Sequence, residues 1–459
     1  MARTLIKGGM VVSGDPRIGD LPRGDVLVED DRIAAIAPQI DLGGASDVTI
    51  VDASDRIVMP GLIQAHYHAW MTGLRSFGGN WTSPYYHKNM HGNIATRFTA
   101  EDVYLGTLMG ALDQVNSGTT TLFDWCHNNP TPAHSDRAID ALQESGIRAV
   151  FAHGTTKPDQ EPGKKTANAR HFTEIPQDPA EVARIRKRLA SDDALVTMAL
   201  AILGPDFSID EVFCQDLRTA REFGLVSSAH VWAKPSRVSP QGYRTAFRAG
   251  LLGPDHNAVH FVYSSDEELK MLADAGASFT ATTVCELMGN PTHSISRILA
   301  LGAKPSLGAD NQTKVAGDMF SVMRHTIQSQ RLLEHQNDPK RPESVAPRSS
   351  RDAFEWATLE GARMMRMENR IGSLTPGKQA DIVLLRGDDL GVFPVHDPIN
   401  TIVFYCDRSS VDSVMIGGRW AKQNGLLAYP RAEITLKQGQ MRASLNGLIA
   451  KAQYVHQPA

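Results

Sequence analysis

The sequence predicts an α/β protein, a (β/α)8 TIM barrel with a small discontinuous β-sandwich domain formed by the N- and C-terminal segments. Between about residues 60 and 370, apolar strand-like runs alternate with helical patterns, which is the order that a parallel barrel requires. Short β-type runs separated by turn residues precede this region, from Thr4 to about Asp55. Similar runs follow it, in Ile371–Leu385 and Val414–Leu427.

Eight apolar runs are the candidate barrel strands, and several are followed by amphipathic helical patterns. The runs are Leu62–Ala65, Gly118–Phe123, Arg148–His153, Leu195–Ala201, Val226–His230, Ala258–Val262, Ser278–Thr282 and Pro305–Gly308. One of the helical patterns, from Ser265 to Leu272, opens with a capping residue. We therefore expect a β-sandwich domain of residues 1–58 and 372–432, a barrel domain of residues 59–371 and a C-terminal helical extension of residues 433–459.

The composition is that of an ordinary enzyme-sized globular protein. Of the 459 residues, 42% are hydrophobic and 21% are charged, so the chain can bury a large core without crosslinks. A formal net charge of -4 provides no basic field for binding a nucleic-acid backbone, and we exclude that class of partner.

The cysteines and the apolar runs indicate the compartment. Four cysteines lie far apart with no CxxC pair, which fits neither a disulfide framework nor a structural zinc knuckle. They are Cys126, Cys214, Cys285 and Cys406. The N-terminus lacks the apolar core of a signal peptide, and no apolar run is long enough to span a bilayer. We expect a cytoplasmic protein that is neither secreted nor embedded in a membrane.

Two histidines one residue apart end the first barrel strand. On an extended strand, residues i and i+2 point the same way, so His66 and His68 can reach one cation together. The pattern alone also fits an ordinary polar strand end.

Three further strand ends carry residues of the same kind. His230 and His260 each close an apolar stretch, and Asp310 closes another. Because strand C-termini meet on one face of a TIM barrel, four histidines and one carboxylate would gather in a small volume. Imidazole with carboxylate suits Zn²⁺, Fe²⁺ or Mn²⁺, and residue identity does not choose among them.

These motifs resemble the amidohydrolase superfamily, in the branch of cytosine-deaminase-like and triazine-hydrolase-like metal-dependent hydrolases. The resemblance rests on the PGLIxxHxH run at residues 60–68, the strand-end histidines, the SLGAD segment at 306–310 and the segment at 371–383. It covers essentially the whole chain, and the order and spacing of the motifs are more specific than any one of them.

The resemblance implies a set of metal ligands and one further histidine at the site. The ligands would be His66, His68, His230 and Asp310, while His260 would lie beside the bound water and the substrate. Two-metal relatives carry a bridging lysine on strand four, and the candidate strand Leu195–Ala201 has no lysine. We therefore expect one divalent ion per subunit, with Zn²⁺ preferred over Fe²⁺ or Mn²⁺.

The expected reaction is hydrolysis at an sp² carbon of a cyclic or aromatic small molecule, through deamination or cleavage of a C–N or amide bond. A divalent cation lowers the pKa of bound water from about 15.7 toward 7 and so supplies hydroxide. Asp310 would accept the proton of that water and pass it to the leaving group, and His260 would orient the hydroxide or polarise the carbon.

The chain departs from the superfamily pattern on strand five. Deaminases of this branch carry a glutamate three residues after the strand-five histidine, and Ala233 stands there. Lys234, Cys285 and Glu286 are candidates to carry the proton in its place, although each also fits a structural or solvated role. The departure keeps a second hypothesis open, namely a metal-dependent decarboxylase or isomerase on the same fold.

Aromatic residues and histidines after the strand ends are candidate substrate contacts. The segment that follows the first strand, residues 70–91, is rich in both and could clamp a flat substrate or pack on the barrel rim. The substrate-binding candidates are Trp81, His127, Trp232, Cys285 and Glu286. The expected partner is a small molecule, and the resemblance implies a homo-oligomer. A non-catalytic scaffold is a third hypothesis, which the five retained strand-end residues oppose.

Overall fold

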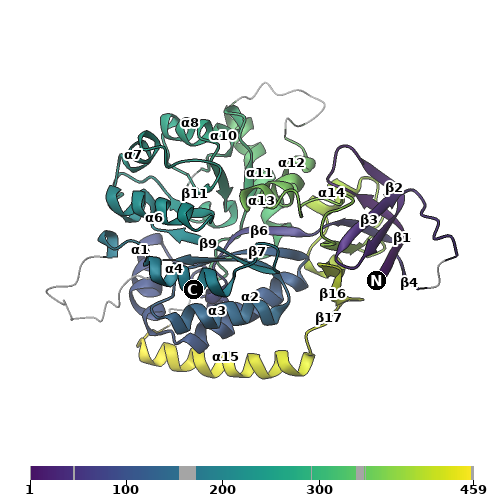
Figure 1. Ribbon diagram of the computed structural model, residues 1–459, viewed down its shortest axis with the longest axis horizontal. Coiled ribbons are helices and arrows are strands. Elements are labelled where there is room, and N and C mark those ends of the chain that lie inside the picture. Colours follow the sequence, from purple (N-terminus) through teal and green to yellow (C-terminus); the bar gives the residue numbers. More distant parts are fainter. Residues whose placement is uncertain are drawn as a thin grey trace.

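The computed structural model describes residues 2–44, 47–154, 172–290, 292–337, 346 and 348–455. It contains an eight-stranded parallel sheet surrounded by helices and a separate nine-stranded mixed sheet built from both ends of the chain (Figure 1). The predicted fold class is confirmed. Among the described residues, none of the helices has the length and apolar character needed to cross a bilayer.

The parallel sheet runs in chain order, and each of its strands pairs with the next. The strands are β6 (Leu62–Tyr67), β7 (Thr119–Cys126), β8 (Arg148–Gly154), β9 (Val196–Ile202), β10 (Ser227–Val231), β11 (His256–His260), β12 (Ser278–Ala281) and β13 (Pro305–Leu307). The barrel closes just beyond β13, where Tyr67 and Asp310 form a parallel bridge. His68 N donates to Asp310 O over 2.8 Å, and Asp310 N donates to His66 O over 3.1 Å.

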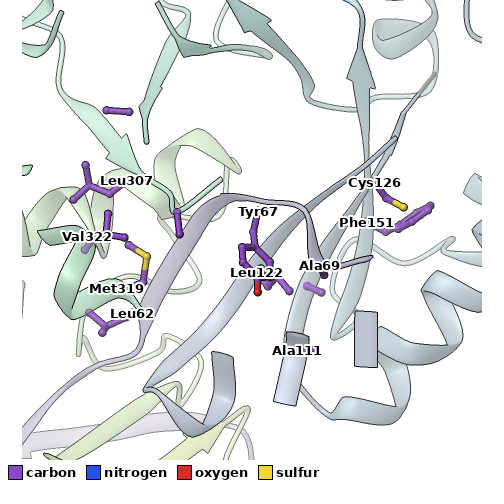
Figure 2. Close-up of a cluster of buried hydrophobic side chains, with 14 of the residues drawn as sticks. Leu62, Tyr67, Ala69, Ala111, Leu122, Cys126, Phe151, Leu307, Met319 and Val322 are labelled. Atoms are coloured by element: carbon purple, nitrogen blue, oxygen red, sulfur yellow. The ribbon is translucent and has the colours of Figure 1, made fainter. Parts of the chain in front are cut away.

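The barrel strands are buried on both faces, which explains why they read as apolar runs rather than alternating ones. Small and large side chains fill the barrel interior, including Ala65, Phe123 and Ala201, and methionines such as Met365 pack against them. Outward-facing side chains form a second cluster against the surrounding helices, in which Leu62 and Leu307 lie near Met319 of α11 (Met319–Asn337) (Figure 2).

Helices follow most strands, and α8 begins with the predicted cap. They include α2 (Ala100–Asn116), α3 (Pro132–Ser145), α4 (Pro179–Arg188), α6 (Asp210–Glu222), α7 (Gly242–Arg248), α8 (Asp266–Asp274), α10 (Ile295–Ala300), α12 (Ser350–Trp356) and α13 (Leu359–Met364). In α8 the Ser265 side chain accepts from Glu268 N over 3.1 Å, which satisfies one of the free N–H groups of the first turn.

The mixed sheet joins the two ends of the chain. Its strands are β1 (Arg3–Val12), β2 (Asp20–Glu29), β3 (Arg32–Ala37), β4 (Val48–Asp52), β5 (Arg56–Pro60), β14 (Ile382–Arg386), β15 (Val411–Ile416), β16 (Arg419–Gln423) and β17 (Leu426–Leu427). The two ends meet where β5 pairs antiparallel with β14, with Pro60 opposite Ile382. A buried core of β-branched and aliphatic side chains, among them Val26, Val58 and Ile382, stabilises this sheet.

A long C-terminal helix, α15 (Arg431–Lys451), crosses the outside of the barrel along α2 (Figure 1). Its end is held by the segment that follows β6. Asn93 Nδ2 donates to Ala452 O over 3.0 Å, and Arg97 Nε donates to Lys451 O over 3.0 Å. The Tyr454 ring lies 5.8 Å from that of Trp81.

The mixed sheet is fixed to the barrel by one buried ion pair. Arg148, at the start of β8, donates to Asp381 through Nε (2.7 Å) and Nη2 (2.9 Å), and Gly417 N donates to the same carboxylate over 2.8 Å. Both side chains are at most 4% exposed.

We expect Asp381→Ala to destabilise the protein by about 3–5 kcal/mol, because it leaves the Arg148 charge buried without a partner. Urea unfolding monitored by circular dichroism measures this. The control is Lys270→Ala, which removes an exposed ion pair with Asp274 and should change the free energy of unfolding by less than about 1 kcal/mol. Equal effects of the two substitutions would contradict the assigned role.

Candidate metal centre and active site

The ends of four barrel strands bring three histidines and one aspartate together. His66 is near the end of β6, His230 near the end of β10, His260 ends β11, and Asp310 follows β13. One side-chain nitrogen or oxygen from each of these residues lies within 4.8 Å of the others. His66 Nε2 is 3.2 Å from His230 Nε2 and 3.6 Å from Asp310 Oδ1.

His68 adjoins this group. Its Nε2 is 3.1 Å from Asp310 Oδ1, and its Nδ1 is 2.6 Å from the carbonyl oxygen of Trp125 on β7. A carbonyl oxygen can only accept, so Nδ1 donates to it, which leaves Nε2 facing Asp310. A backbone partner that fixes the tautomer in this way is characteristic of metal-binding histidines.

The protonation states of the group fit a cation. Burial lowers the pKa of His66 to about 3, and burial together with the nearby His66 and His68 holds the pKa of His230 well below its usual range. Burial alone would raise the pKa of Asp310, but its contacts with His66 and His68 outweigh this and leave the pKa well below the usual range. Neutral imidazoles and an ionised carboxylate are the donor set that Zn²⁺, Fe²⁺ and Mn²⁺ bind.

His260 is held from behind by a buried carboxylate. Its Nδ1 lies 2.9 Å from Thr282 Oγ1 and 3.4 Å from Glu286 Oε1, and that oxygen also accepts from Thr282 N over 2.8 Å. Glu286 is fully buried and lies outside the set of residues that line the neighbouring cavity. These contacts occupy Nδ1 and leave Nε2 of His260 for the metal centre or the substrate.

The backbone is strained where these strands end. His260 (φ 75°), Asp310 (φ 65°) and Ala233 (φ 55°) all adopt the left-handed region that non-glycine residues rarely occupy. Such conformations persist only where the surrounding structure enforces them, and they cluster at functional sites.

A cavity of about 490 Å³ lies over the group, on the face where the strands end. His68, His230, His260 and Asp310 form part of its wall. Of the predicted substrate contacts, Trp81, His127, Trp232 and Cys285 line the cavity and Glu286 does not.

Aromatic contacts extend from the group into this cavity. The Trp232 ring stacks on His260 with centroids 4.1 Å apart, and the His127 ring lies 4.5 Å from that of His68. The flat Trp232–His260 stack gives the cavity a planar wall of the size of an aromatic ring.

The three residues considered in place of the missing glutamate lie in different settings. Lys234 lines the cavity, with its ammonium 5.6 Å from the Trp232 ring centroid. Cys285 also lines it, and burial raises the pKa of its thiol well above the usual range, so the thiol keeps its proton. Glu286 is separated from the cavity by His260.

The sequence analysis missed one carboxylate in this wall. Asp206 lies in the short helix α5 (Gly204–Phe207) after β9, and its Oδ2 accepts from Trp232 N (2.7 Å) and Ala233 N (2.9 Å). It therefore fixes the backbone at Ala233, the position where the resemblance led us to expect glutamate. The same strand-end rule that singled out His230 would have found Asp206 if it had been extended a few residues beyond β9.

Comparisons with known proteins show what the chain is similar to. The sequence pattern of the amidohydrolase family matches residues 239–421. The 5'-deoxyadenosine deaminase of Methanosarcina mazei is 26% identical over 435 residues, which cover 92% of this chain and 94% of that protein. These matches support the predicted resemblance to the amidohydrolase superfamily. They also support a metal-dependent hydrolase of the class that acts on carbon–nitrogen bonds other than peptide bonds.

Solved structures share the fold of this protein. An adenosine deaminase from Xanthomonas campestris with bound zinc superposes with a TM-score of 0.80 at 23% identity, covering 98% of this chain and 99% of that one. Atrazine chlorohydrolase from Arthrobacter aurescens TC1, complexed with zinc, gives a TM-score of 0.81 at 19% identity, covering 96% and 100%.

Asp206 generates a prediction about pH. Burial raises its pKa to about 6, above the value near 4 expected in the unfolded chain. The folded state thus binds this proton more tightly than the unfolded chain does. The protonated carboxyl contributes its full share to the free energy of unfolding below about pH 4, and this share is lost as the pH rises from about 4 to 6. Two pKa units correspond to about 3 kcal/mol.

Asp206→Asn keeps a side-chain oxygen acceptor but cannot ionise. We expect wild type to lose up to about 3 kcal/mol more of its unfolding free energy than this variant between pH 4 and 7. Asp124 and Asp216, whose pKa values burial raises to about 7, titrate in both proteins and cancel in the difference. Parallel pH dependences in urea unfolding would show that Asp206 does not titrate in this range.

Proposed function

We propose that this protein is a zinc-dependent enzyme that replaces the amino group of an aromatic or heteroaromatic small molecule with oxygen from water. One observation carries the proposal. Three imidazoles and one carboxylate converge at a cavity wall that also holds the planar Trp232–His260 stack. The deaminases among the relatives, including those of 5'-deoxyadenosine and 8-oxoguanine, support an amino-substituted ring as the substrate.

We assign one zinc ion per subunit to His66, His68, His230 and Asp310. Three contacts support this assignment: His66 to His230 at 3.2 Å, His66 to Asp310 at 3.6 Å, and His68 to Asp310 at 3.1 Å. A bound zinc ion makes hydroxide available near neutral pH. Asp310, ionised and in contact with two of the histidines, takes up the proton released from water and delivers it to the departing nitrogen.

His260 has a separate role in the proposal. Thr282 and Glu286 fix its ring through Nδ1, so Nε2 meets the reacting carbon or its oxygen in one defined orientation. We assign Glu286 to the positioning of His260 rather than to contact with the substrate. Trp81, His127, Trp232 and Cys285 would contact the substrate, since they line the cavity.

Product analysis tests the reaction class. Aromatic and heterocyclic amines incubated with the zinc-loaded protein should release ammonia and give a product that contains ¹⁸O from labelled water. Release of CO₂ from a carboxylated substrate, without incorporation of ¹⁸O, would replace this proposal with the decarboxylase hypothesis.

Asp310→Asn should lower kcat by at least about 10²–10⁴-fold, the usual contribution of a positioned acid–base group, while the circular dichroism spectrum stays unchanged. Steady-state ammonia release measures kcat. A rate near that of wild type would refute the role of Asp310.

His260→Ala should lose a similar share of activity and still bind one zinc ion, as measured by atomic emission spectroscopy. Loss of the ion would show instead that His260 is itself a ligand. The test discriminates because His260 lies within ligand distance of the other residues of the cluster.

Removal of the metal should destabilise the fold, because an ion that binds only the folded state adds about 4 kcal/mol at a concentration 1,000 times its Kd. We expect dialysis against a chelator to lower Tm and added Zn²⁺ to restore it. The variant His66→Ala should show neither change. If the wild-type Tm is unaffected by chelation and by zinc, the metal assignment fails.

Further features of the chain belong to the same proposal. We infer a homo-oligomer in the cytoplasm that acts on a small molecule. We also keep the division into residues 1–58 with 372–432, residues 59–371 and residues 433–459.

A further inference from the structure

The cavity wall carries more cationic than carboxylate side chains. Its cations are Lys234, Arg237 and Lys314, and its carboxylates are Asp206 and Asp310. Arg237 forms an ion pair with Glu268, 2.8 Å away, and donates a hydrogen bond to the carbonyl oxygen of Pro240. No carboxylate of the described residues lies within ion-pairing distance of either lysine.

The two carboxylates of the wall are already engaged. Asp206 accepts from two backbone N–H groups through Oδ2, and its Oδ1 is buried without a hydrogen-bond partner. Asp310 belongs to the metal cluster, where it faces His66 and His68. Both lysine ammonium groups of the wall therefore lack an ion-pair partner among the described residues, and a bound divalent ion would add positive charge beside them.

Lys314 is fixed more firmly than Lys234. Its ammonium lies over the buried ring of Tyr86, 4.4 Å from the centroid, in a cation–π contact. The aliphatic part of the Lys314 side chain lies against Gly78, where an added Cβ would come within 3.2 Å of Lys314 Cγ. Gly78 N also donates to the carbonyl oxygen of Thr313, the residue before Lys314, over 2.8 Å.

Lys234, by contrast, lies 5.6 Å from the Trp232 centroid and is followed by exposed residues. An ammonium that is held in place loses less conformational freedom when it pairs with a ligand. Of the two lysines, Lys314 is therefore the better preorganised to recognise an anionic group.

We propose that this site takes a planar aromatic amine that bears a carboxylate, and that Lys314 pairs with this carboxylate. The inference rests on the proposed deamination for the amine, while the carboxylate follows from the charges of the wall. The Trp232–His260 stack supplies a flat surface for the ring.

A pair of bicyclic probes that differ only in charge tests this subsite. Indole-5-carboxylate and indole-5-carboxamide have nearly the same shape, and titration calorimetry on the zinc-loaded protein gives both Kd values. We expect wild type to bind the carboxylate at least about tenfold tighter, a typical effect of one charge-assisted contact. Equal binding of the two probes would overturn the proposal.

The variants locate the preference. Lys314→Gln should reduce the ratio of the two Kd values to about twofold or less, and Lys314→Arg should keep most of the preference for the carboxylate. Lys187→Gln, on the exposed face of α4, is the control for a general change in charge and should leave it intact. A preference that persists in Lys314→Gln, or that disappears in Lys234→Gln instead, would show that Lys314 is not the recognising residue.

Binding of these probes does not require turnover, so the two proposals can fail separately. A carboxylate preference that depends on Lys314 supports the subsite even if no aromatic amine releases ammonia. Ammonia release with equal Kd values for the two probes would keep the deamination and reject the carboxylate.

Discussion

The functional interpretation depends on the backbone pairing that closes the barrel between the first and last strands. His68 N and Asp310 N donate across this seam to Asp310 O and His66 O. His66 and Asp310 thus both close the barrel and belong to the metal cluster, which His68 adjoins. Residues separated by more than 240 positions in the chain are thereby held at one edge. A metal centre built on paired backbone has little freedom to move, and such preorganisation favours catalysis.

A second level of support comes from groups that hold the cluster in orientation. The Trp125 carbonyl fixes His68, Glu286 and Thr282 fix His260, and Asp206 fixes the turn after His230. Each is supplied by a neighbouring strand end or the turn after it, so the parallel sheet that positions the cluster also positions what stabilises it. The strained φ values of His260 and Asp310 are consistent with a site whose geometry the fold imposes.

The sequence alone predicted the parts that follow from local rules. Eight strands buried on both faces give eight apolar runs. The pair His66 and His68, at the end of β6, could be recognised because residues i and i+2 of an extended chain point the same way. The role of Glu286 behind His260 could not be foreseen, since it requires the register between β11 and the turn after β12. Asp206 was missed because it lies a few residues beyond the end of β9, and its contacts with Trp232 N and Ala233 N, in the turn after β10, leave no side-chain signal in the sequence.

The far end of the chain is tied to the mouth of the cavity. Tyr454 lies against Trp81, and the residues before it accept hydrogen bonds from Asn93 and Arg97, on the segment that forms one cavity wall. Residues 451–454 thus hold in place the segment that forms one wall of the substrate cavity. Trimming them, or fusing another protein there, would reshape access to the metal while leaving every residue of the metal cluster in place.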